Sequence, residues 1–357
     1  MTMHVGLVDQ SVKFKKRVAS DDVSDYKVIS RGQLVVGFPI DEGVLDFQTL
    51  YDEGIVSPAY GVWDLADEEL VHRPYLKKFL RSNPALAYYK GKLRGSTARR
   101  RSLPAEVFLA LPVPLPTLAS QRRIAAILDQ VDAIRAKRRD VLANLDALPQ
   151  SIFHDMFGDP VDNPKGWSMR HLGDEAHSMQ YGPRFHNESY SEHGVRIVRI
   201  TDLNQSGQLN FDGMPRMSVT DEERRKFELS PGDIVFARTG ATVGKLAIIR
   251  DIDPPSIAGA YFIRIQVSRN VLPEFVAAVL RSRSVQSIIW VKSHQSAQQN
   301  FSGPGLRALP LPIPPLGLQR EFVDRTESVR GARARFRADS FGELFAALQS
   351  RAFQGEL

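Results

Sequence analysis

The sequence contains no cysteine, and this absence excludes several kinds of site at once. A disulfide framework, a zinc site built on thiolates and a thiol nucleophile all need this residue. No apolar run approaches the roughly 18 residues of a transmembrane helix. The N-terminal stretch carries its charges after a short apolar run, which is the reverse of a secretory signal peptide. We therefore expect a cytoplasmic protein that lives in a reducing compartment and does not bind a membrane.

Sequence motifs for catalysis are also missing. The nearest approach to a phosphate-binding loop, GATVGKL at 240–246, has three residues between its glycines where four are required, and Leu246 where Ser or Thr is required. No G-x-G-x-x-G follows a predicted strand, so a dinucleotide site is unsupported. The histidines between 171 and 193 lack the i, i+4 spacing of a helical metal site. We predict no catalytic residue, no metal and no cofactor in this chain.

The composition is that of an ordinary globular protein. Hydrophobic residues make up 43% of the 357 residues and charged residues 25%. This length predicts about two domains. The 47 Lys and Arg residues outnumber the 41 Asp and Glu residues, giving a net charge of +6. A positive excess favours a polyanionic partner, although by itself it leaves nucleic-acid binding and its absence about equally open.

An internal repeat organises the chain. Residues 110–122 read ALPVPLPTLASQR and residues 308–320 read ALPLPIPPLGLQR, at a constant offset. The matched positions include three alternating prolines and a shared Gln-Arg pair. A period this long indicates a duplicated protein rather than a solenoid. The chain is therefore expected to run as variable region, connector, variable region, connector, with boundaries at 1–109, 110–160, 161–307 and 308–357.

Each connector predicts an extended proline strip followed by a long helix. In the first connector the apolar residues follow a heptad-like spacing that indicates a helix of about 30 residues, with a kink or restart at Pro149. The simplest arrangement pairs the two helices as an intramolecular coiled coil; the alternative is two amphipathic helices packed on separate domains. The predicted core positions are Ile124, Ile127, Val131, Ile134, Val141, Leu145, Phe322, Val329 and Phe336.

The variable regions have the pattern of mixed α+β domains. Short alternating runs bounded by turn residues, such as PGDIVFARTG at 231–240 and AYFIRIQV at 260–267, predict strands. Helices are predicted over 72–84 and 273–290, each with a proline near its start. The first region is shorter than the second, so we expect its domain to be abbreviated or the chain to be truncated at its N-terminus.

Basic residues gather around the predicted loops of both variable regions. Arg and Lys suit phosphate contacts, and the amides of the loop at 293–300 suit base edges, although each site taken alone could be a solvated loop. The candidate nucleic-acid contacts are Lys13, Lys15, Lys16, Arg17, Arg99, Arg100, Tyr181, Arg184, Arg199, Arg238, Thr239, Lys245, His294, Gln298 and Asn300.

Taken together, these motifs resemble the specificity subunit of type I restriction-modification systems. The two proline-strip cassettes at 111–157 and 309–353 look like the central conserved regions of that family. The ordered motifs Gly166-Trp167, Leu172-Gly173, Tyr181-Gly182, PGDIV at 231–235 and Gly240 to Lys245 resemble its target recognition domains, as does GIVSPAY at 54–60 in the first region. The resemblance covers essentially the whole chain, apart from the short first domain.

The resemblance implies an α+β protein with two target recognition domains separated by two long helices that pair as an antiparallel coiled coil. Such a subunit is not an enzyme: it reads a bipartite double-stranded DNA target and holds two adenine methyltransferase subunits, joined by restriction-translocase subunits. S-adenosylmethionine, ATP and magnesium are then expected on those partners. The alternatives are a truncated or inactive specificity cassette, a structural adaptor that reads no DNA, and a methyltransferase fused to a recognition module.

Overall fold

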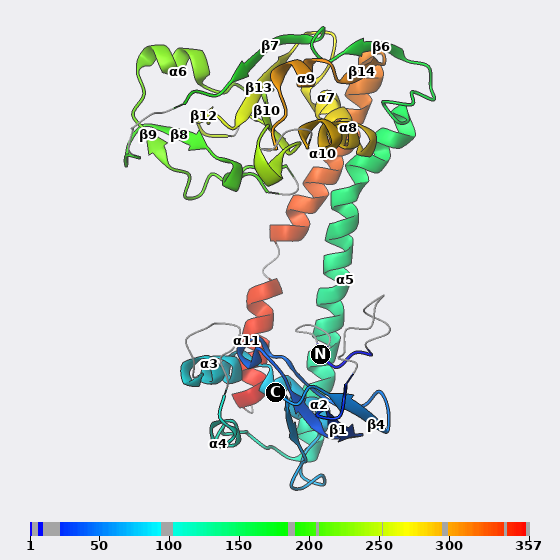
Figure 1. Ribbon diagram of the computed structural model, residues 1–357, viewed down its shortest axis with the longest axis vertical. Coiled ribbons are helices and arrows are strands. Elements are labelled where there is room, and N and C mark those ends of the chain that lie inside the picture. Colours follow the sequence, from blue (N-terminus) through cyan, green and yellow to red (C-terminus); the bar gives the residue numbers. More distant parts are fainter. Residues whose placement is uncertain are drawn as a thin grey trace. The chain divides into compact units, whose positions relative to one another are not determined.

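The computed structural model describes residues 1, 6–9, 22–93, 103–184, 190–204, 207–251, 253–294, 299–338 and 341–354. Helices and strands are mixed throughout, which confirms the predicted α+β class (Figure 1). The chain divides into two compact units, one of residues 1–139 and 340–357 and one of residues 140–339. In the part of the chain that is described, no helix combines the length and the apolar composition needed to span a membrane.

The second unit is built around a four-stranded antiparallel sheet in the order β11-β10-β13-β7. Its central strand β10 is buried at all four positions, as expected for an apolar run with neighbours on both sides. Smaller sheets join β12, β8 and β9, and β14 with β6. The strands are β6 (Ser168–His171), β7 (Ala176–Tyr181), β8 (Val195–Val198), β9 (Arg216–Met217), β10 (Ile234–Ala237), β11 (Leu246–Ile248), β12 (Ser256–Ala258), β13 (Phe262–Val267) and β14 (Pro310–Ile313).

Helices cover this sheet and complete the main hydrophobic core of the unit. The core joins the sheet to α7 and to aromatic residues of the long helices, with Phe153, Phe157, Phe275 and Phe322 in mutual ring contact. The helices are η3 (Ile200–Asp202), α6 (Asp221–Phe227), η4 (Gly240–Thr242), α7 (Pro273–Arg281), α8 (Arg283–Ser293), α9 (Gly303–Arg307), α10 (Leu316–Ala338) and the C-terminal part of α5 (Leu118–Phe157).

The first unit contains a smaller version of the same arrangement. Its three-stranded antiparallel sheet has the order β3-β2-β5, and β1 pairs with β4 beside it. The elements are β1 (Lys27–Ser30), β2 (Leu34–Val36), η1 (Ile40–Glu42), β3 (Leu45–Phe47), β4 (Glu53–Val56), β5 (Gly61–Trp63), α2 (Arg73–Leu80), α3 (Asn83–Lys92), α4 (Ala105–Leu109), α11 (Phe341–Gln354) and the N-terminal part of α5.

The duplication seen in the sequence extends to these sheets. β2 lies between β3 and β5 as β10 lies between β11 and β13, and a short 3-10 helix follows each central strand. Two helices then follow the last strand of each set, α2 and α3 in the first unit and α7 and α8 in the second. The two units therefore share one core plan, to which the second unit adds β6 to β9.

The Gln of the repeated Gln-Arg pair has the same buried position in both units. Gln121 and Gln319 are both fully buried. The Gln121 Oε1 accepts from the His72 N–H at 2.8 Å, and the Gln319 Oε1 accepts from the Leu272 N–H at 2.8 Å. These donors lie at the N-caps of α2 and α7. Each Gln thus ties its connector to the domain helix beside it.

The amide nitrogens of the same two side chains donate in corresponding ways. The Gln121 Nε2 donates to the Leu70 and Pro116 carbonyls, at 2.9 and 2.8 Å. The Gln319 Nε2 donates to the Pro314 carbonyl at 2.9 Å and to the Asn270 carbonyl at 3.4 Å. Every polar atom of these buried amides therefore has a backbone partner, as burial requires.

The long helix differs from its prediction in length and continuity. α5 runs for 40 residues through Pro149, where a kink or restart was predicted. A proline removes one helical hydrogen bond, but burial of Phe153 and Phe157 in the core holds the following turns in place. In the second connector the described residues form α10 and α11.

Within each unit the paired helices run antiparallel. In the second unit Phe322 of α10 contacts Phe153 and Phe157 of α5, and Arg333 further along α10 pairs with Asp146. In the first unit Ala352 of α11 packs with α5 near residues 124–128, while Arg135 of α5 lies over the Phe345 ring at 4.2 Å. The pairing is thus made separately by α10 and by α11.

The predicted helical core positions are buried unevenly. Ile124 and Phe322 are buried; Ile127, Val131, Leu145, Val329 and Phe336 are half-buried; Ile134 and Val141 are 46% and 40% exposed. Leu128 and Ala125, outside the predicted set, are buried. The buried stripe at this end of α5 therefore follows the i, i+3, i+4, i+7 spacing of a helix packed on a domain, while the long helix as a whole fits the predicted coiled-coil linker between two sheet-containing domains.

The two predicted domain helices are each divided. The helix predicted over 273–290 is α7 and α8, because Ser282 takes an extended conformation and its hydroxyl accepts from the Val285 N–H, capping α8. The helix predicted over 72–84 ends at Leu80, and α3 begins at Asn83 with Pro84 in its first turn. In both cases a serine with an extended backbone stands at the N-cap of the second helix, although only Ser282 caps it with its side chain.

Candidate nucleic-acid interface

Arg238 lies where the chain leaves the central strand β10 of the second unit. Its N–H donates to the Tyr261 carbonyl at 2.9 Å, and its carbonyl accepts from the Phe301 N–H at 2.7 Å. The guanidinium then lies over the Tyr181 ring, 4.7 Å from its centroid. The Arg238 Nε is buried and has no hydrogen-bond acceptor among the described residues. The backbone of Arg238 is therefore fixed by two hydrogen bonds, and its guanidinium is held over an aromatic ring.

Tyr181 ends strand β7 and supports this arginine. Its hydroxyl accepts from the Gly303 N–H, at 2.8 Å, and the side chain is 45% exposed. Gly182 follows directly, and a Cβ there would lie 2.2 Å from the Ala258 carbonyl oxygen, so glycine is required for the close approach of the two strands. Tyr181 and Arg238 thus form an aromatic-cation pair on a rigid sheet.

The end of the loop predicted at 293–300 joins the same site. Thr239 and Asn300 form an antiparallel bridge, and the Gly240 N–H donates to the Gln299 carbonyl at 3.0 Å. The Asn300 Oδ1 is buried and has no donor among the described residues. Gln298 lies outside the described residues. Amide and guanidinium groups are side chains suited to base edges, and this strand end brings Asn300 and Arg238 into neighbouring chain segments.

A second group of side chains continues from Gln299 to the end of α8. The Gln299 Nε2 lies 2.8 Å from the His294 Nε2, and the His294 ring stacks on Trp290 with centroids 4.4 Å apart. Trp290 is 62% exposed. A cavity of about 600 Å³ opens here, lined by Gly240, Arg283, Gln286, Trp290, His294 and Gln299 among others. Aromatic faces and amides around such a hollow can stack on and hydrogen-bond to a base.

The remaining predicted contacts are distributed differently. Arg199 is committed to an internal bidentate pair with Asp202, at 2.7 and 3.0 Å, and this carboxylate raises the pKa of the Arg199 guanidinium. Arg184 is exposed and Lys245 is half-buried in the turn before β11. The other predicted basic residues lie outside the described residues: Lys13, Lys15, Lys16, Arg17, Arg99 and Arg100.

Sequence reasoning missed two aromatic residues beside the site. Trp290 and Tyr261 are about 60% exposed, at 62% and 59%. A signal for Trp290 was present, because Val285 and Ile289 of α8 are buried four residues apart and Trp290 falls off that stripe. A large aromatic on the polar side of a helix is a candidate contact surface. Tyr261 gave no comparable signal, since it sits within an apolar run.

The position of Arg238 is occupied by a different residue in the first unit. Phe38 follows the central strand β2 as Arg238 follows β10, and its ring lies 6.1 Å from that of Tyr60. Phe38 is 38% exposed. The two units therefore present different chemistry at the same point of a shared fold.

Comparison with known proteins agrees with this architecture. Residues 164–331 match the family described as the type I restriction modification DNA specificity domain. This part of the chain therefore carries a type I restriction-modification DNA specificity domain. The match confirms the resemblance to specificity subunits that was drawn from the repeat and the ordered motifs.

Individual relatives are distant in sequence. The chain is 23% identical over 328 residues to the EcoKI specificity subunit of Escherichia coli K12, an alignment that covers 82% of this chain and 67% of that protein. It is 24% identical over 283 residues to the EcoBI specificity subunit of Escherichia coli, covering 69% of this chain and 58% of the relative. The matched part thus leaves a third or more of each relative uncovered.

The fold is similar to a solved structure of the same class. A chain from the work titled "Structural basis underlying complex assembly and conformational transition of the type I R-M system" matches with a TM-score of 0.62 and 19% identity. The match covers 93% of this chain and 84% of that one. At this identity the match supports the fold.

Proposed function

We propose that this chain reads a bipartite double-stranded DNA target, one half with each unit, and that it has no catalytic role of its own. The Arg238–Tyr181 pair of the second unit carries the proposal. An arginine guanidinium can form bidentate bonds to guanine or bond a phosphate. The rigid strands on either side would hold it in register on the duplex.

The duplicated fold supports two readers with different half-sites. Both units share the sheet plan and the buried Gln that joins sheet domain to connector. Phe38 at the position of Arg238 replaces a hydrogen-bond donor with an apolar ring, which would favour contact with a thymine methyl group or with a base step. The two half-sites would therefore differ in sequence.

Exposed apolar residues on the helices support a scaffolding role. Ile134, Val141 and Leu148 of α5 are 46%, 40% and 39% exposed, and Leu344 of α11 is 65% exposed. We infer that these residues pack against helices of two adenine methyltransferase subunits, which the restriction-translocase subunits would then join. S-adenosylmethionine, ATP and magnesium would be bound by those partners and not by this chain.

Domain-specific substitution tests the reading function. Arg238→Ala in the complex with methyltransferase subunits should relax or change one half of the methylated motif and leave the other half unaltered. Phe38→Ala serves as the matched variant in the first unit and should act on the opposite half. Unchanged half-sites in both variants would contradict the assignment of these two positions.

A structural adaptor that reads no DNA is the competing function. It predicts that the assembled complex binds DNA of any sequence equally, with or without Arg238. Binding of the complex to short duplexes at several salt concentrations separates the two cases. Phosphate contacts alone give a steep salt dependence without sequence preference.

A further inference from the structure

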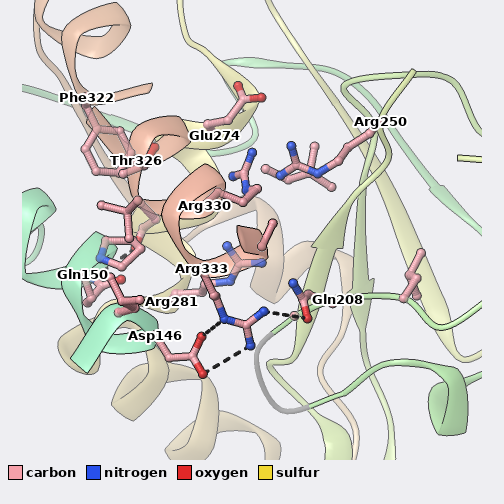
Figure 2. A pocket seen from close by; sticks show the side chains of 18 of the residues that line it. Asp146, Gln150, Gln208, Arg250, Glu274, Arg281, Phe322, Thr326, Arg330 and Arg333 are labelled. Atoms are coloured by element: carbon pink, nitrogen blue, oxygen red, sulfur yellow. Dashed lines mark hydrogen bonds and ion pairs between the residues drawn. The ribbon is translucent and has the colours of Figure 1, made fainter. Parts of the chain in front are cut away.

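A second cavity in the second unit gathers four arginines away from Arg238. It measures about 740 Å³ and lies among α5, α7, α10 and the end of β11 (Figure 2). Arg250, Arg281, Arg330 and Arg333 all line it. Figure 2 shows Arg333 turned toward Asp146 and Gln208, and the ion pair with Asp146 neutralises this one guanidinium. The other three arginines, Arg250, Arg281 and Arg330, remain as candidate ligand-binding groups.

These three arginines form few direct ion pairs with carboxylates. Arg250 and Arg330 share one carboxylate, that of Glu327, which lies 3.3 Å from the Arg250 Nη1. Arg281 donates from Nη2 to the Leu246 carbonyl oxygen at 3.0 Å and forms no ion pair with the described residues. Glu274 and Asp253 also line the cavity, but the Asp253 carboxylate accepts from the Arg250 backbone N–H.

The crowding is reflected in the acidity of the guanidinium groups. Arg281 faces the cavity, yet the protein around it desolvates the side chain and, with the charges of Arg330 and Arg250, lowers its pKa to about 10. Burial and Arg250 also lower the pKa of Arg330, against the opposing effect of Glu327. Like charges held this close indicate a place where a bound anion would be stabilised.

The first unit contains a matched arrangement without the cluster of arginines. Through the repeated Gln contacts, Asp129 corresponds to Glu327 and Asp132 to Arg330, while Lys78 of α2 corresponds to Ala278 of α7. There the Lys78 Nζ lies 2.8 Å from Asp129 and 3.0 Å from Asp132, so the junction neutralises itself. The second unit has an arginine where the first has a neutralising carboxylate.

Part of the remaining wall of the cavity is apolar. Leu145, Pro149, Phe211, Ile248 and Val329 line it beside the arginines. Pockets of this size, mostly apolar with a few convergent charged groups, are typical of small-molecule sites, and arginines bind phosphate through paired N–H bonds. A DNA duplex is too wide to enter such a hollow.

We propose that this cavity binds a phosphorylated small molecule of nucleotide size, with its phosphate held by Arg250, Arg281 and Arg330 and its organic part against the apolar wall. This makes the second unit a ligand-binding unit as well as a reader. A bound ligand would join α7, which packs on the sheet, to α10, which is one of the paired helices.

Calorimetric titration of the full chain with pyrophosphate, AMP and ATP tests the proposal. We expect binding with a Kd below about 1 mM, tighter for the nucleotides than for pyrophosphate because only they reach the apolar wall. Arg330→Asp, which recreates the acidic residue of the first unit, should weaken binding at least about tenfold, the loss expected for one charged hydrogen-bond partner. Arg250→Gln provides a milder second variant if Arg330→Asp does not fold.

Lys78→Gln is the matched control, since it removes a cation from the neutralised junction and should leave ligand binding unchanged. Absence of binding to all three probes at about 10 mM would overturn the proposal. So would binding that survives both arginine variants. Loss of duplex DNA affinity in Arg330→Asp without any small-ligand binding would also overturn it and assign these arginines to the DNA backbone.

Discussion

Replacing Gln319 with alanine should destabilise the second unit by about 3 kcal/mol, since each buried group left without its partner costs about 1–3 kcal/mol. The Gln319 side chain is fully buried and holds three backbone groups. Two of these bonds, to the Leu272 N–H and the Pro314 carbonyl, are short at 2.8 and 2.9 Å, whereas the bond to Asn270 at 3.4 Å adds little.

Hydrogen exchange read by mass spectrometry resolves this effect by region. In Gln319→Ala the amides at the start of α7 should exchange about a hundredfold faster, which corresponds to about 3 kcal/mol, while those at the start of α2 stay unchanged. Gln121→Ala, the matched variant, should give the opposite pattern. Equal effects on both helices, or a change below about threefold, would refute the reasoning from buried hydrogen bonds.

Three further outcomes are expected. Arg238→Ala should cost about 1–3 kcal/mol of discrimination at one half-site if the residue contacts a base, or lower affinity for all duplexes alike if it contacts a phosphate, as measured by binding to a panel of single-base variants. Leu128→Ala should lower the free energy of unfolding in urea by about 3 kcal/mol because the side chain is buried. Ile134→Ala, at a 46% exposed position, should change it by under about 0.5 kcal/mol, and similar losses in both variants would contradict the assignment of the buried face of α5. Burial and the charge of Arg122 lower the pKa of His72 below its unfolded value of 6.5, so the stability of the first unit falls as the pH drops below 6.5. His72→Gln should therefore flatten the dependence of thermal stability on pH between about pH 7 and 5. An unaltered slope would show that another group is responsible.

Much of the organisation was predictable because the repeat is local and dense. The proline strips and the shared Gln-Arg pair mark both connectors in the sequence, and the alternating runs mark β10 and β13. The segment from Gly240 to Lys245, which lacks the spacing of a phosphate-binding loop, joins β10 and β11, and these two strands pair antiparallel. These features depend on residue spacing, which a single sequence displays directly.

The helix interiors were less predictable because tertiary packing decides them. Leu128 and Ile127 are adjacent and equally apolar, and only the domain packed against α5 selects Leu128 for burial. Pro149 breaks a helix by local preference, yet the aromatic core that follows keeps α5 continuous. The spacing of apolar residues alone predicts neither the burial of Leu128 nor the continuity of α5 at Pro149.

The candidate site was also predictable only in part from the sequence. Arg238 could be singled out as a basic residue at the end of a predicted strand, but its contact with Tyr181 joins residues 57 positions apart in the chain. Arg199 was also a basic residue at the end of a predicted strand, but its guanidinium is held by the Asp202 carboxylate. Which arginine has donors to offer is set by local partners, and the sequence does not show those.

Mapping of methylated adenines tests the central claim most directly. The chain would be co-expressed with a type I methyltransferase subunit from its own system, and genomic DNA sequenced by a method that detects modified bases in single molecules. Our account predicts one bipartite motif with two different half-sites and a fixed spacer. Methylation at a palindrome or at a single half-site would contradict the claim that both units read DNA, and no methylation from a confirmed complex would favour an adaptor.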